Sequence, residues 1–498
     1  MRYTVVALGS LLLAACASVD AAPATKHGSG KRNVIFMISD GFGQTSETMA
    51  RTFVRETKAL DYGWASVMDS MLKGSVRTAA SNTLVTDSAA GATAYSCGLK
   101  TYNGAIGVDQ DGKPCGTIME AAKAKGYKTA LVTTSRITHA TPASFAAHVA
   151  HRDMEDLIAL QMIGRNLTQR GPVVDLMYGG GLCHFLPDSN ENSCRSDNVD
   201  LWKMAQDAGF STIDTRETFN KLVAEPARLK TPILGLFADD HMSYEIDRQP
   251  LLQPSLTEMT KSALDIISRQ ARQADDAPGF FIMIEGARID MAGHDNDPAT
   301  QIHDVVEYWN AVTAAKEFVA RHPDTLLVST SDHETGGLAL GIDGEYLWYP
   351  EVLKPVKRSA ESLCKELRKA DGDVEKQIAN TVLPKYLGIA NATSEEVAEI
   401  AESISKGSTK CKMAIGNVVS RRAHVGWSTG GHTGTDVGLY ACGNQAGGLH
   451  GNVDNTQLGH FLERYLGVDT RPITEEMKGV DTHQAAFSLQ ARSYHQHN

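Results

Sequence analysis

The chain has 498 residues, of which 42% are hydrophobic, so it is long and apolar enough to bury a large core. Its 59 acidic and 48 basic residues give a net charge of −11 and form no long block of one sign. This balance excludes a basic protein and argues against a nucleic-acid-binding surface.

The first residues are typical of an export signal. Arg2 supplies a positive charge, and an apolar run covers residues 5–13. The four residues Leu-Ala-Ala-Cys that end at Cys16 resemble the lipobox of bacterial lipoproteins. The pattern predicts an exported, periplasmic protein.

Two ways of processing this leader remain open. In the lipoprotein reading, residues 1–15 are a signal peptide, Cys16 is acylated and anchors the chain to a membrane, and residues 16–31 form a polar tether. In the alternative, an ordinary signal is cut at the small residues 22–24, and Cys16 is discarded.

Beyond the leader, short apolar runs alternate with amphipathic stretches, which is the pattern of a mostly parallel sheet with crossover helices. Strands are predicted over residues 33–39, 128–135, 173–178, 233–237, 280–284 and 325–331. Helices are predicted over residues 116–125, 153–168, 257–273 and 300–320. The fold class is therefore α/β, with a central sheet flanked by helices.

A polar block rich in Lys and Glu interrupts this rhythm over residues 343–430. Its stretches 359–369 and 395–405 are predicted to be helical. We interpret the block as an insertion in one domain over residues 32–470, because residues on both of its sides contribute to one candidate site. The tail over residues 471–498 is polar and is predicted to be irregular.

Seven cysteines follow Cys16, and export would place them in an oxidising compartment. The pair most strongly indicated brackets a polar loop, and the two others are weaker predictions, because spacing does not fix connectivity. The pairs are Cys183 with Cys194, Cys97 with Cys115, and Cys364 with Cys411. The chain contains no C-x-x-C motif, which argues against thiolate zinc sites and dithiol redox chemistry.

Residues that suit metal binding follow several of the predicted strands, where ligands of open α/β sheets commonly bind. They are Asp40, His139, Thr141, Glu285, Asp290, His294, Asp332 and His333, and His432 lies in a glycine-rich segment further on. Carboxylates that converge at a buried strand edge repel one another unless cations neutralise them. Carboxylate with imidazole suits zinc, whereas carboxylate with hydroxyl suits magnesium.

Each of these signals is modest alone. An acidic residue after a strand is more often a helix cap or a loop residue. Asp290 and His294 have the spacing of one helical turn, which also arises by chance. The joint recurrence at strand ends is what favours a metal centre.

Other candidates are interpreted as structural. His148 and His151 suit ordinary helix or loop positions, and glycines 179–181 suit a tight turn. Residues 109–112 lack the further ligands of a calcium loop and suit a hairpin turn.

The segment LVTDSAAGATAYSCG, residues 84–98, places Asp87 and Ser88 where a β-rich run gives way to a helical one. The segment has no His or Lys beside Ser88 to act as a base. A metal ion can activate a hydroxyl in place of a base. Ser88 is therefore a candidate nucleophile beside the candidate metal centre.

The longer segment VTDSAAGATAYSCGLKTYNGAIGVD, together with the metal-type segments, closely resembles the alkaline phosphatase family. The resemblance runs from about residue 33 to about residue 466 in the family's order, with residues 343–430 the least comparable part. It implies hydrolysis of phosphate monoesters of broad type to an alcohol and inorganic phosphate, through a phosphoserine intermediate on Ser88.

The resemblance also implies two Zn²⁺ ions and one Mg²⁺ ion. The implied ligands are Asp290, His294 and His432 for the first zinc; Asp40, Asp332, His333 and the facing Ser88 for the second; and Asp40, Thr141 and Glu285 for magnesium. Arg152 corresponds to the arginine that clamps phosphate, for which a guanidinium is suited because it can hold two oxygens at once.

Residues around the implied ligands carry further expectations. Asp87 either positions Arg152 or caps a helix, and both roles stay open. His139 stands where some members have Asp and others His, and Met291 stands where some have Lys or His. These two positions shape the third metal site and the surroundings of phosphate. The family is often dimeric, so a homodimer is a further expectation.

Two kinds of rival function fit these residues less well: another hydrolase on the same scaffold, and a binding protein. A sulfatase on the same scaffold would need C/S-x-P-x-R at its nucleophile, and here Ser88 is followed by Ala-Ala-Gly-Ala. Phosphodiesterases of the superfamily commonly use Thr and lack the arginine corresponding to Arg152. A binding protein without turnover would not need Ser88.

Overall fold

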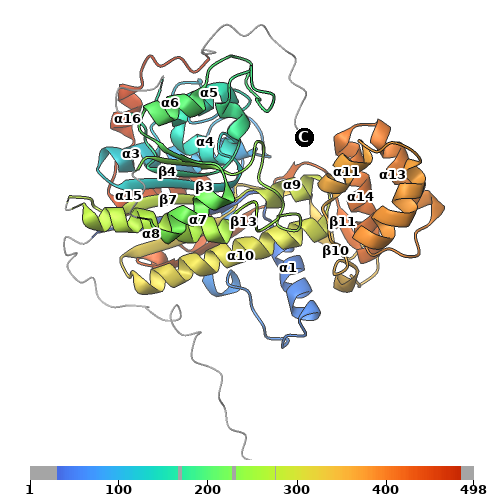
Figure 1. Cartoon of the computed structure of the whole chain (residues 1–498). Helices are drawn as coiled ribbons and strands as arrows, with labels where there is room; N and C mark the ends of the chain where they lie inside the picture. The colour runs from blue at the N-terminus through green and yellow to red at the C-terminus, as the bar shows by residue number, and fades with distance from the viewer. Residues whose placement is uncertain (1–30, 166–170, 227–230, 275, 484–498) are drawn as a thin grey trace, which may run out of the picture.

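The computed structural model of the chain describes residues 31–165, 171–226, 231–274 and 276–483 (Figure 1). The predicted signal peptide, Cys16, all but the last residue of the predicted tether, and residues 484–498 of the tail lie outside the described residues. Within the described part, no helix combines the length and the apolar character needed to cross a membrane.

A ten-stranded sheet forms the centre of the molecule, in the order β14-β2-β13-β8-β1-β7-β3-β4-β6-β5. Its strands are β1 (Asn33–Ser39), β2 (Leu72–Arg77), β3 (Lys128–Arg136), β4 (Leu176–Gly180), β5 (Ser211–Ile213), β6 (Ile233–Leu236), β7 (Phe280–Gly286), β8 (Thr325–Thr330), β13 (Val437–Gly443) and β14 (Gly451–Asp454). The seven strands from β8 to β5 are mutually parallel, and β13 runs antiparallel to both β8 and β2. The predicted α/β class is confirmed, and all six predicted strands lie in the parallel part.

Helices cover both faces of the sheet. They are α1 (Gln44–Thr57), α2 (Ser88–Cys97), α3 (Ile118–Ala124), α4 (Ala140–Ala146), α5 (Glu155–Met162), α6 (Leu201–Asp207), α7 (Arg216–Ala224), α8 (Leu256–Gln273), α9 (Arg288–His294), α10 (Pro298–Arg321) and α15 (Asn455–Leu466). Figure 1 shows α8 and α10 along one side of the sheet and α3 and α4 on the other.

Strand β1 shows why the central strands read as continuous apolar runs. Ile35 and Met37 face the hydrophobic core on the α8 and α10 side, whereas Val34, Phe36 and Ile38 face the core formed with α2, α3 and α4. A strand buried on both faces needs apolar side chains at every position. The strand therefore ends where the first charged residue, Asp40, begins the site.

The insertion contributes α11 (Ala360–Leu367), α12 (Val374–Gln377), a π-helical segment (Ile378–Tyr386), α13 (Ser394–Ser405) and α14 (Ser408–Ala423). These elements lie together at one end of the molecule, drawn in orange (Figure 1). Two ion pairs tie the insertion to α9 and the residue after it: Arg288 Nη2 lies 2.9 Å from Glu361 Oε1, and Lys412 Nζ lies 2.9 Å from Asp295 Oδ1. Part of the insertion also joins the core that contains α10.

The structure contains all three predicted disulfides. They join Cys97 to Cys115, Cys183 to Cys194, and Cys364 to Cys411. The buried Cys442 belongs to none of the three. The disulfides bridge segments of the parallel sheet region as well as α11 and α14 of the insertion.

Two sequence-based expectations are wrong. The tail is not irregular throughout, because α16 (Arg471–Glu476) forms there, and Ile473 and Met477 pack against Ala121 of α3. The three glycines do not form one tight turn, since Gly179 and Gly180 lie within β4, where a Cβ atom at Gly180 would meet a backbone oxygen of residue 240 at 2.2 Å. Only Gly181, at φ +88°, has the left-handed conformation expected of a turn.

Candidate active site

The candidate site lies at the carboxyl ends of the central strands β1, β7 and β8. Asp40 follows β1, Glu285 lies near the end of β7, and Asp332 and His333 follow β8. Because these strands are parallel neighbours, with Ile38 opposite both Glu285 and Thr330, their ends meet at one edge of the sheet. The fold therefore brings together side chains that are almost 300 residues apart in sequence.

Ser88 is the first residue of α2, and its hydroxyl faces this edge. Its Oγ lies 3.0 Å from Nε2 of His333. Asp87 is the N-cap, and its Oδ1 accepts a hydrogen bond of 3.0 Å from the backbone N–H of Ala90. The N-terminus of a helix has free N–H groups and a dipole that favour an anion. The position of Ser88 thus suits a nucleophile that receives a phosphoryl group.

The first group of metal-type residues, here called the buried cluster, consists of Asp40, Asp332 and His333. Nε2 of His333 lies 3.6 Å from Oδ1 of Asp40 and 3.2 Å from Oδ2 of Asp332. All three side chains are fully buried. Burial, followed by the charges of Asp332 and Asp290, raises the pKa of Asp40 well above its usual value.

The second group, here called the open cluster, consists of Asp290, His294 and His432. Helix α9 places Asp290 and His294 one turn apart, and the short strand β12 (His432–Thr433) brings His432 opposite them. The Nε2 atoms of His294 and His432 lie 3.3 Å and 3.6 Å from the carboxylate of Asp290 and 3.2 Å from each other.

Backbone contacts fix how the two histidines of the open cluster present their rings. Nδ1 of His294 lies 2.7 Å from the carbonyl oxygen of Gly430, and Nδ1 of His432 lies 2.8 Å from that of Thr86. A carbonyl oxygen only accepts, so each Nδ1 carries a proton and donates it. In the neutral rings, the lone pair then sits on Nε2 and faces Asp290, which is the arrangement of metal-binding histidines.

A third group joins Asp40 to His139, Thr141 and Glu285. Ligand atoms of Asp40, His139 and Glu285 lie within 4.8 Å of one another. Burial raises the pKa of Glu285 to about 7. Burial and the nearby Arg152 lower the pKa of His139 to about 3, which keeps its ring neutral. The family resemblance placed His139 beside the third metal site and not among its ligands, whereas the structure groups His139 with Asp40 and Glu285.

Unsatisfied polar atoms test whether metal ions fit these groups. Among the described residues, several buried ligand-type atoms have no hydrogen-bond partner: both carboxylate oxygens of Asp40, Oδ2 of Asp332, Oε1 of Glu285, Oγ1 of Thr141 and Nδ1 of His139. Buried polar atoms are almost always paired, and exceptions commonly mark an ion or a catalytic group. Oxygen and imidazole donors in this number match Zn²⁺ and Mg²⁺.

Arg152 lies on the connection between α4 and α5. Its Nη1 donates to Oδ2 of Asp87 at 3.1 Å, and its Nη2 lies 3.0 Å from Nε2 of His139. The same Oδ2 of Asp87 accepts from the backbone N–H of Gly104 at 2.9 Å. Asp87 therefore fills both roles that the sequence left open, because one oxygen caps α2 and the other holds Arg152 near Ser88.

Three hydroxyl residues of the site were not identified from the sequence. Oγ1 of Thr133 donates to Oε2 of Glu285 at 2.5 Å, and Oγ of Ser135 lies 3.2 Å from the same oxygen. Oγ1 of Thr335 donates to Oδ1 of Asp290. Thr133 and Ser135 lie in the polar run Thr-Thr-Ser near the end of β3, which is their only signal in the sequence and is no guide to function by itself.

His148, one of the residues interpreted as structural, has its partners outside the site. Fully buried His148 lies 2.6 Å from the carbonyl oxygen of Gly107 and 3.0 Å from Oε1 of Glu120. Met291 stands beside the open cluster, and its Sδ lies 2.7 Å from Nη1 of Arg288. Neither side chain belongs to one of the three candidate metal groups described above.

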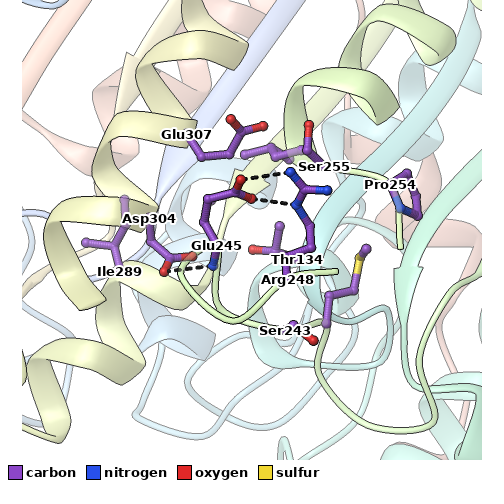
Figure 2. A pocket seen from close by; sticks show the side chains of 12 residues that line it. Thr134, Ser243, Glu245, Arg248, Pro254, Ser255, Ile289, Asp304 and Glu307 are labelled. Carbon is purple, nitrogen blue, oxygen red and sulfur yellow. Dashed lines mark hydrogen bonds and ion pairs between the residues drawn. The ribbon is translucent and has the colours of Figure 1, made fainter. Parts of the chain in front are cut away.

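Figure 2 shows a separate small pocket beside α8 and α10. Glu245 pairs with Arg248 at 2.7 Å, and the backbone N–H of Glu245 donates to Asp304 at 3.3 Å (Figure 2). Glu307 accepts from the backbone N–H of Thr257 at 2.8 Å. None of the predicted site residues lines this pocket. Its carboxylates are paired with protein groups, in contrast to the unpartnered oxygens of Asp40, Asp332 and Glu285 at the strand ends.

A sequence profile of alkaline phosphatase matches residues 31–468. An alkaline phosphatase of Schizosaccharomyces pombe is 45% identical over 459 residues, which cover 91% of this chain and 84% of that protein. A repressible alkaline phosphatase of Saccharomyces cerevisiae is 40% identical over 500 residues, which cover 95% of this chain and 88% of that protein.

A solved structure of an alkaline phosphatase is also similar to this chain in its fold. The crystal structure of Thermus thermophilus alkaline phosphatase superimposes with a TM-score of 0.76 at 28% identity and covers 90% of this chain and 95% of that one. The matched residues 31–468 contain Ser88, Arg152 and all three metal-type groups.

Proposed function

This chain belongs to the alkaline phosphatase family, and from that membership we propose that it hydrolyses phosphate monoesters to an alcohol and inorganic phosphate through a phosphoserine at Ser88. The observation that carries the proposal is the placement of Ser88 Oγ at the start of α2, within 3.0 Å of His333 and close to Arg152 through their shared neighbour Asp87. A nucleophile, an anion clamp and unsatisfied ligand atoms meet at one point.

The residues that would hold metal ions follow the three groups. One Zn²⁺ would be held by Asp290, His294 and His432. A second Zn²⁺ would be held by Asp40, Asp332 and His333, together with Ser88. One Mg²⁺ would be held by Asp40, Thr141 and Glu285. When bound, these ions would stabilise the serine and leaving-group alkoxides as Lewis acids and would offset the repulsion among the carboxylates. The unpartnered oxygens of Asp40, Glu285 and Thr141 support this assignment.

The side chains of the chain itself orient and receive the phosphoryl group. Arg152 binds two of its oxygens with its planar guanidinium, and Asp87 holds that guanidinium beside the start of α2. Ser88 Oγ forms a bond to phosphorus while the bond to the alcohol oxygen breaks on the opposite side. Water then attacks the phosphoserine, which releases inorganic phosphate and restores the Ser88 hydroxyl.

The wider setting of the enzyme is also proposed. The three disulfides support export from the reducing cytosol. We place the protein in the periplasm, anchored through an acylated Cys16, with a single catalytic domain over residues 32–470 and the insertion 343–430 within it. A homodimer is the expected assembly. Mass spectrometry of the mature N-terminus and light scattering would test the anchor and the dimer.

The central experiment traps the intermediate. The enzyme is mixed with p-nitrophenyl phosphate, quenched in acid and digested, and the peptide that carries Ser88 is examined for added phosphate. The Ser88→Ala variant should lose both the phosphopeptide and turnover. Ser96→Ala is the matched control, because Ser96 lies on the same helix. Its Oγ donates to the carbonyl oxygen of Ser144 at 2.6 Å, and neither residue belongs to a metal group. Full turnover by Ser88→Ala would refute the phosphoserine route.

The same assay separates the rival functions. A monoesterase should release nitrophenol from p-nitrophenyl phosphate much faster than from bis-(p-nitrophenyl) phosphate or p-nitrophenyl sulfate. A preference for the diester or the sulfate would favour a different hydrolase on this scaffold. Metal and phosphate binding with no turnover of any of the three would favour a binding protein.

A further inference from the structure

A buried ion pair stands immediately behind the site. Arg136 is the last residue of β3, and Glu155 is the first residue of α5. Nε of Arg136 donates to Oε2 of Glu155 at 2.9 Å, and Nη2 donates to Oε1 at 2.7 Å. Both side chains are only 13% exposed. The two parallel hydrogen bonds make this a bidentate pair with a fixed geometry.

The pair closes a loop of the chain that carries three site residues. His139, Thr141 and Arg152 all lie between Arg136 and Glu155 in sequence. His139 and Thr141 follow β3 directly, while Arg152 lies on the connection that leads into α5. The pair therefore fixes both ends of the segment that presents these residues.

Further contacts bind Glu155 to the same turn. Oγ1 of Thr138, the residue before His139, donates to Oε2 of Glu155 at 2.6 Å. The backbone N–H of His139 donates to the carbonyl oxygen of Arg136 at 3.0 Å. One carboxylate thus holds the turn through both Arg136 and Thr138, and the turn sets the position of the His139 ring.

A disulfide-bonded loop supports Glu155 from the other side. Nε2 of His184 lies 3.2 Å from Oε2 of Glu155, and its Nδ1 lies 3.5 Å from Oδ1 of Asp156. His184 follows Cys183, which is bonded to Cys194. The carboxylate of Glu155 is therefore held between the loop and the turn, although it touches none of the predicted metal ligands or Ser88.

We propose that Glu155 is a positioning residue of the phosphate site, which through Arg136 and Thr138 sets where His139 and Arg152 stand relative to Ser88. The inference rests on the proposed function and adds a residue to it. His139 is the link to phosphate, because its Nε2 lies 3.0 Å from Nη2 of Arg152. A displaced turn would move the guanidinium of Arg152. It would also move Thr141, which belongs to the third metal group.

The expected size of the effect follows from the burial of the pair. Arg136 Nη1 also lies 2.7 Å from Oδ1 of Asp240, so Glu155→Gln leaves the charge of Arg136 partly compensated. The change nevertheless breaks the bidentate contact that fixes the turn, so the turn is expected to shift. A displacement of about 1 Å in a positioning group can cost roughly 100-fold in rate. Phosphate binding, which depends on Arg152 directly, should therefore weaken more than the global fold does.

The test uses Glu155→Gln in the full-length, metal-replete enzyme. We expect the dissociation constant of inorganic phosphate, measured by titration calorimetry, to rise roughly 10- to 100-fold. We also expect less Mg²⁺ to be retained per chain after gel filtration, because Thr141 moves with the turn. Unchanged phosphate affinity in a folded Glu155→Gln variant would overturn the proposal.

Asp175→Asn is the matched structural control. Asp175 forms a largely buried ion pair with Lys123 at 2.5 Å and accepts from the backbone N–H of Thr129, near the opposite end of β3. This variant should lose thermal stability to an extent similar to Glu155→Gln and keep its phosphate and Mg²⁺ affinities. An equal loss of phosphate affinity in both variants would show a general structural effect and would overturn the positioning role.

A double-mutant cycle with Arg152→Ala decides whether Glu155 acts through Arg152. In the Arg152→Ala background, Glu155→Gln should weaken phosphate binding little further, whereas fully additive effects would contradict the proposal. Arg152→Ala with normal phosphate affinity would refute the phosphate clamp of the proposed function, so the two failures are distinguishable. If Glu155→Gln does not fold, Thr138→Val removes one bond to Glu155 and should shift phosphate affinity in the same direction, and an unchanged affinity would count against the proposal.

Discussion

The buried cluster and the open cluster offer the same kinds of ligand atoms, carboxylate oxygen and imidazole nitrogen, but their side chains differ in solvent exposure. The side chains of Asp40, Asp332 and His333 are 0% exposed, whereas those of His294 and His432 are 23% and 14% exposed. The buried cluster sits directly on strand ends, and the open cluster sits on α9 and β12. Ser88 touches the buried cluster through His333.

We propose that the two clusters have different roles in the reaction. A nucleophile benefits from a rigid, dry surrounding, because electrostatic interactions are stronger where water is excluded. A leaving group and an incoming water molecule need access to solvent. The buried cluster thus suits activation of Ser88, and the open cluster suits departure of the alcohol and entry of water.

Chelation is expected to have the largest effect and to separate the two clusters. EDTA should abolish activity, and Zn²⁺ with Mg²⁺ should restore it, because both clusters depend on cations. Zinc should leave in two phases, with the open cluster losing its ion first. Release is followed with a chromogenic chelator, and His432→Ala should lack the faster phase. Activity that is indifferent to EDTA would contradict both clusters as metal sites.

Arg152→Lys is expected to have the second-largest effect, and it tests the phosphate clamp on which both clusters would depend. Lys keeps the charge but cannot form the planar bidentate contact with two phosphate oxygens. We expect kcat/KM for p-nitrophenyl phosphate to fall roughly 100-fold, with the larger part in KM. Arg248→Lys is the control, because Arg248 pairs with Glu245 at 2.7 Å in the separate pocket of Figure 2. It should lower stability and leave KM nearly unchanged. Wild-type kinetics of Arg152→Lys would show that charge alone is enough.

Asp40→Asn should have opposite effects on activity and on stability. The pKa of Asp40 is raised by burial and by neighbouring carboxylates, so its ionised form destabilises the metal-free protein near neutral pH. Asn removes that charge, and the metal-free variant should gain about 0.5–2 kcal/mol in its free energy of unfolding while losing activity. Urea unfolding of both proteins in EDTA measures this gain. A metal-free variant less stable than wild type would contradict the repulsion.

The smallest expected effect concerns His148, a buried histidine outside both clusters. Burial by itself would lower the pKa of His148, but the charge of Glu120 and the hydrogen bonds to Glu120 and Gly107 raise it above its usual value. The folded pKa is raised, so this stabilisation is fully present below about pH 6.5 and is lost as the pH rises through the folded pKa.

Glu120→Gln removes this pH dependence without removing the contact. Its amide can donate to neutral His148 and still accept from the backbone N–H of Thr117, as Glu120 does now at 2.8 Å. We expect the variant to be less stable than wild type by about 1 kcal/mol at pH 6 and nearly equal at pH 9. Thermal unfolding at both pH values measures the difference. A constant difference would show that His148 stays neutral.

Six of the ten strands of the sheet and most of the candidate ligands could be predicted from the sequence because their signals are local. The β1 segment is apolar at every position and ends at Asp40, and α9 keeps Asp290 and His294 one turn apart. The edge strand β14 and its neighbour β2 were not predicted, since they are short, polar and partly exposed. Their pairing with each other joins residues far apart in the chain.

The sequence by itself determined which residue types stand at the ends of the buried strands and which serine begins a helix beside them. Only the tertiary structure decided that His333 reaches Ser88, that His432 completes the open cluster, and that Glu155 holds Arg136 behind the site. Apolar periodicity and helix caps act within a few residues, so they are visible in the chain. Contacts between distant segments depend on how the whole sheet and its helices pack, and no local pattern encodes them.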